Sequence, residues 1–562
     1  MNIELSAKHF GVIAIVVTMG LGVEASRARA QDSPPAQDKN VVVKASPLPA
    51  PPSAPPDSNT DGTVAVGGRT IAYRAVAGTI TVGATDQQDA LLGLDGKLLP
   101  DSGEKPIDPA KPEDAPPTAR MFYAAYFEKG ARAESRPVMF FYNGGPGSST
   151  MWLHMGSFGP RRVVTADTQH GAAAPYRISN NEYSLLDTTD LVFIDAPGTG
   201  FSRVMGKDKE KAFWGTDQDA HAFERFIRRF LTKHDRWNSP KYLFGESYGT
   251  PRSAVLSAML HNVDLNGIVL LSAILSFDNS VDGPRWNPGV DQAYALALPT
   301  YAATAFYHHK LPSQPAALEP FLAEVEKYAL GDYMNALLQG SELSETQKQA
   351  TATKLHEYTG LPVDLLMKAN LRVSGGIFSK NLQDPQGLTT GRLDTRYAGP
   401  HLDPLSEEAE YDPQSAAISS AYTTAINEYM RAELKYGQNQ TYKPSAYGDG
   451  FSWDLRHQAP GGPPVGRGEG GLNVMPDLAH SMKLNPKMKI LLAGGYYDLA
   501  TPFFEGIYEM RHLPIPQSMQ SNISYRYYDA GHMVYVNEGV LKKFHDDVAA
   551  FVHDTQGRSE SK

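Results

Sequence analysis

One stretch of the sequence decides the fold class: residues 241–260 read KYLFGESYGTPRSAVLSAML. The run at 241–244 is short and mostly apolar, as expected of a strand that is buried on both faces of a parallel sheet. Gly245 and Gly249 allow a tight turn, and good helix formers follow from Pro251. A strand, a glycine turn and a helix in this order form the repeating unit of an α/β fold.

Similar patterns lie on both sides of this stretch. Short apolar runs that suit buried strands occur at residues 137–142, 191–195, 267–272, 489–493 and 524–528. Two earlier segments, 69–82 and 120–127, alternate in period two and predict hairpin strands. Residues 217–234 repeat aromatic and aliphatic side chains at helical spacing. The alternation of strands and helices predicts a doubly wound, mostly parallel sheet with helices on both faces.

The alternation is interrupted by a long insertion between two core strands. From residue 278 to residue 475 the pattern is largely helical, at 318–338, 345–358 and 416–436, with glycine- and proline-rich loops. An insertion of this size predicts a cap domain over the top of the sheet. The α/β core is then divided into a first part at 61–277 and a second part at 476–562.

The composition excludes several classes of protein. The chain has 562 residues, a net charge of −10, 41% hydrophobic residues and no cysteine. These values are typical of a globular protein with room for more than one domain. A mildly acidic chain without a long basic run argues against binding to nucleic acid. The absence of cysteine excludes disulfides, thiolate metal sites and a cysteine nucleophile.

The N-terminal region has the pattern of an export signal. Lys8 precedes an apolar stretch at 10–23 and a small-x-small cleavage site that ends at Ala30. A membrane anchor is the alternative, but the apolar stretch is shorter than the ~20 residues that a span needs. We therefore expect residues 1–30 to be a cleaved signal peptide and residues 31–60, rich in proline, to be a disordered linker. The mature protein would be periplasmic or secreted, without an integral membrane segment, and the lack of cysteine favours a Gram-negative periplasm.

Ser247 is the candidate nucleophile. It is the central residue of GESYG at 245–249, a G-x-S-x-G motif between a predicted strand and a predicted helix. Such a turn lifts the serine hydroxyl into the open at the end of the strand. The following helix also directs the positive end of its dipole toward this point, which favours developing negative charge. The five residues alone occur often by chance, so the prediction depends on the context.

A base and an acid follow later strands. His532 comes directly after the run at 524–528, and Asp498 follows the run at 489–493. A structural histidine and a turn-forming aspartate are the alternatives. The order Ser247, Asp498, His532 is that of nucleophile, acid and base in α/β-hydrolases. It predicts a triad in which Asp498 orients His532 and His532 carries the proton.

A glycine-rich loop offers the remaining part of such a site. Residues 143–147, NGGPG, follow the apolar run at 137–142. Free N–H groups of these glycines, ahead of a proline that stiffens the turn, are able to stabilise a tetrahedral intermediate. A plain glycine turn is the alternative. A phosphate-binding loop is disfavoured because no Lys-Ser/Thr pair follows.

Several blocks, in the right order, resemble the serine carboxypeptidase family. NGGPGSS at 143–149 is similar to the family's oxyanion and carboxylate-binding loop, and GESYG is similar to its nucleophile motif. Residues 181–202, Tyr497-Asp498 and AGHMV at 530–534 also resemble family blocks. The resemblance extends over roughly 120–275 and 485–550, and the insertion between them is not recognisable.

The resemblance implies roles for individual residues beyond the triad. The backbone N–H groups of Gly145 and Tyr248 would form the oxyanion hole. Asn143, Glu246 and the N–H of Gly144 would bind the terminal carboxylate of a peptide substrate.

The sequence departs from the family at two positions. Ser148 stands where the family has a disulfide-forming cysteine, so that bond is lost. Ser157, within SFGP, stands where the family commonly has a second glutamate. Its absence removes the glutamate partner of Glu246 and puts a strongly acidic pH optimum in doubt.

The resemblance implies a serine carboxypeptidase that removes the last residue of peptides with a free C-terminus through an acyl-enzyme on Ser247. It implies no cofactor and no metal, and it leaves the oligomeric state and the residue preference open. Another α/β-hydrolase is the first alternative, either a prolyl aminopeptidase, an esterase or an acyltransferase. Asn143 and Glu246 argue against a prolyl aminopeptidase. A non-catalytic periplasmic peptide-binding protein is the second alternative.

Overall fold

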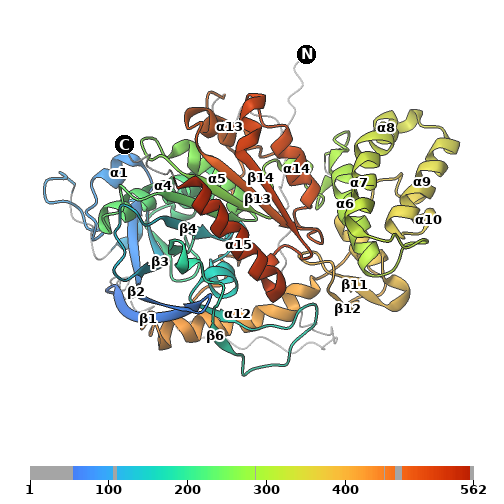
Figure 1. Ribbon diagram of the computed structural model, residues 1–562. Coiled ribbons are helices and arrows are strands. Elements are labelled where there is room, and N and C mark those ends of the chain that lie inside the picture. Colours follow the sequence, from blue (N-terminus) through green and yellow to red (C-terminus); the bar gives the residue numbers. More distant parts are fainter. Residues whose placement is uncertain (1–54, 105–110, 285–286, 449, 463–470, 557–562) are drawn as a thin grey trace, which may run out of the picture. The chain divides into compact units, whose positions relative to one another are not determined.

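One ten-stranded sheet lies at the centre of the computed structural model, which describes residues 55–104, 111–284, 287–448, 450–462 and 471–556 (Figure 1). In spatial order its strands are β1 (Ser58–Val66), β2 (Arg69–Gly83), β3 (Thr118–Glu128), β7 (Asp190–Ile194), β4 (Val138–Tyr142), β9 (Lys241–Glu246), β10 (Gly267–Leu271), β13 (Lys489–Gly495) and β14 (Ile523–Tyr528), with β8 (Arg203–Met205) paired to β3. Each strand predicted from an apolar run or from alternation is present.

The sheet is parallel over most of its width. The pairs β7–β4, β4–β9, β9–β10, β10–β13 and β13–β14 are parallel. The strands β1, β2 and β3 form an antiparallel extension, and β3 is antiparallel to β7. The mostly parallel α/β sheet predicted from the sequence is therefore confirmed. Because the carboxyl ends of parallel strands meet at one edge, the loops after β4, β9, β13 and β14 come together there.

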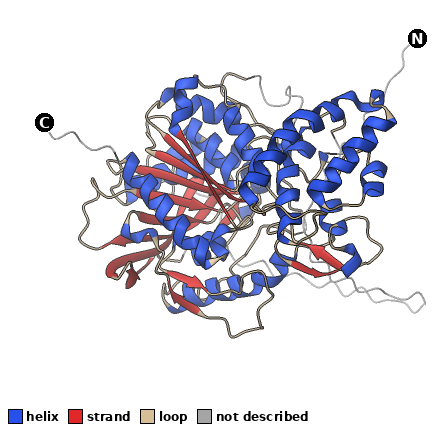
Figure 2. Ribbon diagram, turned by 45° about the vertical axis from the view of Figure 1, so that its right-hand side comes forward, coloured by secondary structure: helices blue, strands red, loops and turns tan. Residues whose placement is uncertain are grey.

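Helices cover both faces of the sheet, so the doubly wound arrangement is confirmed (Figure 2). Phe140 and Phe141 of β4 are neighbours in the chain and point to opposite faces, each into a separate apolar core. The covering helices are α12 (Pro413–Ala432) and α15 (Glu538–Thr555) on one face, and α4 (Thr216–Lys233), α5 (Gly249–Met259) and α13 (Met475–Leu484) on the other.

The insertion at 278–475 is mostly helical, as predicted. Its helices before α12 are α6 (Gln292–Tyr307), α7 (Leu318–Tyr328), α8 (Met334–Gln339), α9 (Glu345–Thr359), α10 (Val363–Lys368) and α11 (Gly375–Asn381). They build a third core with α14 (Phe503–Arg511), beside which α6 and α7 lie in Figure 1. The helix expected over 318–338 is interrupted at Gly331, whose backbone is not helical. The described residues, from 55 to 556, belong to one compact unit that includes the described part of the insertion.

One inserted helix does not belong to the third core. The side chains of Ile418, Tyr422, Ile426 and Tyr429 on α12 pack into the core beneath the main sheet. They recur at helical spacing, so one continuous face of α12 is apolar. The last part of the insertion thus contributes to the body of the α/β fold and not to a cap alone.

The folded part begins slightly earlier than the sequence suggested. β1 starts at Ser58, so the last three residues of the linker predicted at 31–60 are in a strand. The side chains of β1 alternate between more and less exposed positions, which is what an edge strand requires. The predicted signal peptide at 1–30 lies outside the described residues. No helix in the described part of the chain combines the length and apolar character needed to cross a bilayer.

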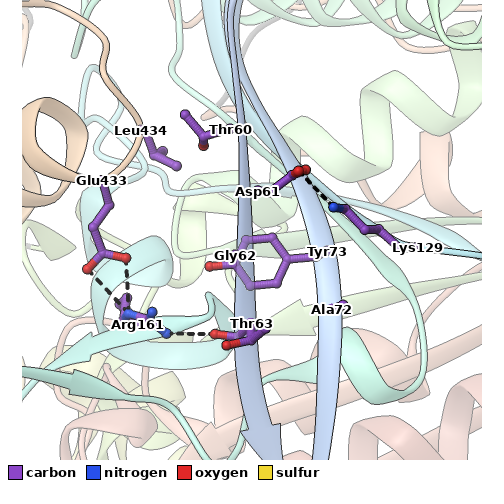
Figure 3. Close-up of a pocket in the computed structure, with 10 residues that line it drawn as sticks. All are labelled: Thr60, Asp61, Gly62, Thr63, Ala72, Tyr73, Lys129, Arg161, Glu433 and Leu434. Atoms are coloured by element: carbon purple, nitrogen blue, oxygen red, sulfur yellow. Dashed lines mark hydrogen bonds and ion pairs between the residues drawn. The ribbon is translucent and has the colours of Figure 1, made fainter.

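A cavity of about 470 Å³ lies between the β1–β2 hairpin and the end of α12 (Figure 3). Arg161, at its wall, is paired with Glu433 at 3.1 Å, and Lys129 is paired with Asp61 at 2.8 Å. None of the residues predicted for the active site lines this cavity. The chemistry predicted from the motifs is therefore located elsewhere, at the carboxyl edge of the parallel strands.

Candidate active site

Ser247 lies at the sharp turn between β9 and α5. Its φ of +59° is in the left-handed region, which residues other than glycine adopt only under constraint. A Cβ on Gly245 would lie 2.1 Å from the carbonyl oxygen of Gly249, so only glycine fits there. Ser247 is half-buried, whereas Glu246 and Tyr248 on either side are buried. The turn therefore presents the serine and hides its neighbours.

Asp498 and His532 form a buried pair at the ends of β13 and β14. His532 Nδ1 lies 2.8 Å from Asp498 Oδ2. Asp498 Oδ1 accepts hydrogen bonds from the backbone N–H groups of Ala500 and Thr501 at 2.9 and 3.0 Å. The Thr501 hydroxyl donates to Oδ2 at 2.7 Å. Donors on both oxygens fix the orientation of the carboxylate toward the histidine.

The pKa of His532 is the result of two opposing effects. Burial lowers it, but the charge of Asp498 and the hydrogen bond to it outweigh burial, so the pKa is raised above 6.5. Because Nδ1 is engaged by Asp498, Nε2 is the ring nitrogen that is left to exchange a proton. This arrangement suits a general base.

Ser247 and His532 are both attached to the end of β10. The Ser247 N–H donates to the Leu271 carbonyl at 3.0 Å, and the Ser272 hydroxyl donates to the His532 carbonyl at 2.7 Å. Leu271 and Ser272 are consecutive residues, so the two attachments meet at one point of the sheet edge. The structure thus attaches the turn of Ser247 and the loop of the Asp498–His532 pair to adjacent residues at the end of β10.

The glycine loop after β4 lies against the turn that carries the serine. A Cβ on Gly144 would come within 2.3 Å of the Tyr248 nitrogen, so the two backbones are in direct contact. Gly145 follows with a φ of +111° and is exposed. The backbone of this loop therefore lies close to the Tyr248 N–H, which the predicted oxyanion hole requires.

Glu246 is a buried acid directly before the serine. Its Oε2 accepts hydrogen bonds from Asn143 Nδ2 and from the Tyr535 hydroxyl, both at 2.9 Å. Burial raises the pKa of Glu246 from 4.5 to about 7, although the field of His532 and these two hydrogen bonds oppose the shift. The acid is therefore protonated over much of the range below neutral pH, and in that form it is able to donate a hydrogen bond.

Tyr535 is a residue of this site that the sequence did not reveal. Ser157, at the position of the family's second glutamate, turns away and donates to the Leu153 carbonyl at 2.6 Å. The Tyr535 hydroxyl contacts Glu246 instead, and its ring occupies space that a side chain on Gly156 would fill. The only available signal was the position of Tyr535, close behind His532 in the chain.

One segment of the insertion holds the loops of the acid and the base. The His532 N–H donates to the Leu393 carbonyl at 2.6 Å, and the Leu499 N–H donates to the Arg392 carbonyl at 3.0 Å. These are backbone contacts, so the sequence pattern carried no signal for them. They show that the insertion takes part in fixing the site.

A second part of the insertion, residues 443–448 and 450–455, lies on the glycine loop. Ser445 forms an isolated bridge with Ser148, and a Cβ on Gly147 would meet the Phe451 ring at 2.7 Å. The Trp453 indole N–H donates to the Tyr248 hydroxyl at 3.1 Å. The walls around the predicted oxyanion donors are therefore aromatic and come from the insertion.

Comparison with known proteins supports the motif analysis over part of the chain. The family model described as serine carboxypeptidase matches residues 113–275. The retinoid-inducible serine carboxypeptidase of Rattus norvegicus is 27% identical over 216 residues, which is 37% of this chain and 43% of that protein. The pheromone-processing carboxypeptidase KEX1 of Phytophthora infestans (strain T30-4) is 30% identical over 143 residues, or 23% of this chain and 21% of that protein. The matched part spans less than half the length of these relatives.

Among solved structures, Kex1(delta)p, a prohormone-processing carboxypeptidase from Saccharomyces cerevisiae, aligns with a TM-score of 0.44 and 13% identity. The alignment covers 85% of this chain and 91% of that one. The match of residues 113–275 includes β4, the glycine loop, Ser247 and β10. The resemblance of this chain to the serine carboxypeptidase family, first seen in its motif blocks, is therefore confirmed, and it rests on that segment.

Proposed function

We propose that the protein is a serine carboxypeptidase that removes the C-terminal residue of peptides through an acyl-enzyme on Ser247. Asp498 holds the His532 imidazole, and His532 Nε2 accepts the proton of the Ser247 hydroxyl as its oxygen attacks the last peptide carbonyl. The N–H groups of Gly145 and Tyr248 stabilise the oxyanion that forms. His532 then gives its proton to the amine of the departing residue.

Hydrolysis of the acyl-enzyme completes the cycle. His532 takes a proton from a water molecule, and the resulting hydroxide attacks the ester carbonyl of Ser247. The tetrahedral intermediate is stabilised by the same two N–H groups. Its collapse returns the proton to the Ser247 oxygen and releases the shortened peptide. Apart from water, each step uses groups of the chain itself.

The observation that carries this proposal is the buried hydrogen bond between Asn143 and Glu246, directly beside Ser247. A serine hydrolase of esters has no need for an uncharged acid and an amide at this place. A carboxypeptidase has to bind a free carboxylate and reject a continuing chain. Asn143, protonated Glu246 and the N–H of Gly144 provide donors for such a carboxylate.

The test is the release of a single amino acid from a peptide with a free C-terminus, followed by mass spectrometry. Ser247→Ala is expected to reduce turnover by about 10⁶-fold, because members of a triad act as a unit. Ser521→Ala, which changes an exposed serine at the amino end of β14, serves as the control and keeps full turnover. Retention of more than about a tenth of the activity by purified Ser247→Ala would contradict the mechanism.

We further infer export of the protein, from the charged start, the apolar stretch at 10–23 and the small-x-small site at Ala30. Expression of the full chain followed by mass determination of the mature N-terminus tests this. A new N-terminus at Gln31 is expected. A chain that retains residues 1–30 after membrane passage would contradict it.

A further inference from the structure

Arg252 is the largest of the fully buried side chains in the described part of the protein. It lies on α5, in the first turns of the helix that follows the serine. Its Nε lies 2.5 Å from Oδ2 of Asp219 on α4, and the two side chains are 0% and 1% exposed. Three aromatic rings surround the guanidinium, with Cζ at 5.4, 4.5 and 5.6 Å from the ring centres of Tyr142, Phe223 and Tyr248.

The third contact of this guanidinium reaches the site. Arg252 Nη1 donates to the carbonyl oxygen of Asn143 at 2.7 Å. That carbonyl and the N–H of Gly144 belong to one peptide unit, which is planar and trans, so the two groups point in opposite directions. A hydrogen bond that fixes the carbonyl therefore also fixes the direction of the Gly144 N–H.

The other contacts of this peptide are consistent with a fixed orientation. Asn143 Oδ1 accepts from the Leu153 N–H at 3.0 Å, and its Nδ2 donates to Glu246. On the far side, Gly144 is pressed against the Tyr248 nitrogen. The carbonyl of Asn143 is thus held by a charged donor, while the other polar groups of this residue have neighbours within the protein.

We propose that Arg252 is a positioning residue that aims the Gly144 N–H at the C-terminal carboxylate of the substrate. This inference rests on the proposed function. It predicts that Arg252 affects the binding of the free carboxylate, although its side chain touches no substrate. The Asp219 carboxylate keeps the guanidinium in the plane from which it reaches the carbonyl.

Stability alone does not account for this arginine. Removing two charges from water costs about as much as their attraction returns, so a buried ion pair contributes little net stability compared with apolar residues of the same volume. The chain also contains a second buried arginine–aspartate contact away from the site, in which the aspartate is shared with Arg136. Arg236 Nη1 lies 2.5 Å from Asp190 Oδ2, with side chains 3% and 5% exposed, at the opposite end of the sheet. This pair serves as an internal control.

The experiment compares Arg252→Met and Arg252→Lys with Arg236→Met. Each is assayed on one peptide with a free C-terminal carboxylate and on the same peptide as its C-terminal amide. Labelling with a serine-directed phosphonate gives the concentration of active sites. Because kcat is calculated from that concentration, unfolded protein does not affect it. For Arg252→Met we expect kcat/KM for the acid to fall at least about tenfold, the effect of a misdirected hydrogen bond to a charge. We expect little change for the amide, so the ratio of acid to amide falls.

The pattern of the variants decides between a positioning and a structural role. Arg252→Lys keeps a charge but loses the planar fork, so an intermediate ratio is expected. Arg236→Met should lower Tm and leave the ratio unchanged. If Arg252→Met does not fold, Asp219→Asn, which frees the guanidinium to move, should lower the ratio in the same direction.

The inference would be overturned if the ratio of kcat/KM for the acid to kcat/KM for the amide were unchanged in Arg252→Met, or in Asp219→Asn where that variant is used. It would also be overturned if this ratio fell equally in Arg236→Met. In both cases the wild-type protein would still hydrolyse the acid, so the proposed function would stand. A wild-type protein that reacts with the phosphonate but releases no C-terminal residue would overturn the proposed function and this inference together.

Discussion

The site contains two buried acids, Glu246 at the end of β9 and Asp498 after β13, whose carboxyl groups differ in the hydrogen-bond donors around them. The Asp498 carboxylate accepts hydrogen bonds from two backbone N–H groups and one hydroxyl, in addition to its contact with His532. Among the described residues, the Glu246 carboxyl has the Asn143 amide and the Tyr535 hydroxyl as its only hydrogen-bond partners. Both residues are nearly inaccessible to solvent.

The difference shows how the number of donors decides the form of a buried acid. Donors that converge on a carboxylate stabilise its charge, whereas burial without enough donors favours the neutral acid. Asp498, with donors on both oxygens, is oriented as an acceptor for the His532 N–H. Glu246, with a pKa raised to about 7, is arranged to gain or lose a proton near neutral pH. The following predictions test this contrast.

Asp498→Asn should have the largest effect. The amide is unable to hold His532 in the required tautomer, so kcat should fall by about 10⁴-fold. Steady-state kinetics on a peptide with a free C-terminus measures this, and circular dichroism checks the fold. A fall of less than about a hundredfold would mean that Asp498 does not orient the base.

Glu246→Gln should change the pH dependence more than the rate at low pH. In the wild-type protein, kcat/KM should fall about tenfold per pH unit above 7, because the ionised acid loses its donor. Gln is a donor at every pH. At pH 9 the fraction of maximal kcat/KM that the variant retains should therefore be about a hundredfold larger than the fraction that the wild-type protein retains. The acid limb, which belongs to His532, should move slightly to lower pH, because Gln lacks the negative charge that helps to raise the pKa of His532. Parallel alkaline limbs in the two proteins would rule out Glu246 as the group that titrates.

Thr501→Val should weaken the Asp498 side of the site moderately. It removes one hydroxyl donor to the Asp498 carboxylate and leaves both backbone N–H donors in place. A hydrogen bond to a charged group contributes about 1.5 kcal/mol, which corresponds to roughly a tenfold fall in kcat. A matched control is Thr423→Val on α12, whose kcat should remain that of the wild type. A fall in kcat as large as that of Asp498→Asn would contradict the view that several donors together orient the Asp498 carboxylate.

Tyr535→Phe should have the smallest effect on the maximal rate. Its hydroxyl lowers the pKa of Glu246 by hydrogen bonding to the charged form, so its removal should raise that pKa further. The alkaline limb of kcat/KM should then move to higher pH by about one unit. The measurement is the pH profile on a single peptide. A limb displaced toward lower pH would show that the hydroxyl stabilises the neutral acid instead.

The sequence predicted the parts of the molecule that are local in the chain. Apolar runs located the strands because a strand buried on both faces has no polar positions, and the order of Ser247, Asp498 and His532 followed from the ends of those strands. The start of β1 at Ser58 was missed because the ends of an element are its least defined part. The break at Gly331 was missed although a glycine inside a helical pattern is itself a local signal for a break.

The remaining features of the site depend on contacts between distant segments. Tyr535 contacts Glu246 from the end of β14, and the Leu393 carbonyl reaches His532 from inside the insertion. Neither residue belongs to a motif, and a backbone carbonyl has no side-chain identity to recognise. The packing of α12 beneath the sheet was also hidden, because its apolar face is equally compatible with a cap.

Glu246 and His532 are close enough for the charge of one to alter the proton affinity of the other. Under the proposed function, a bound C-terminal carboxylate keeps Glu246 neutral and so removes one of the negative charges that hold a proton on His532. Binding of the C-terminal carboxylate thereby favours the neutral form of His532, in which it is able to act as the base. By thermodynamic reciprocity, neutral His532 favours the protonated Glu246 that binds the carboxylate. The end of a peptide chain then acts as both substrate and activator.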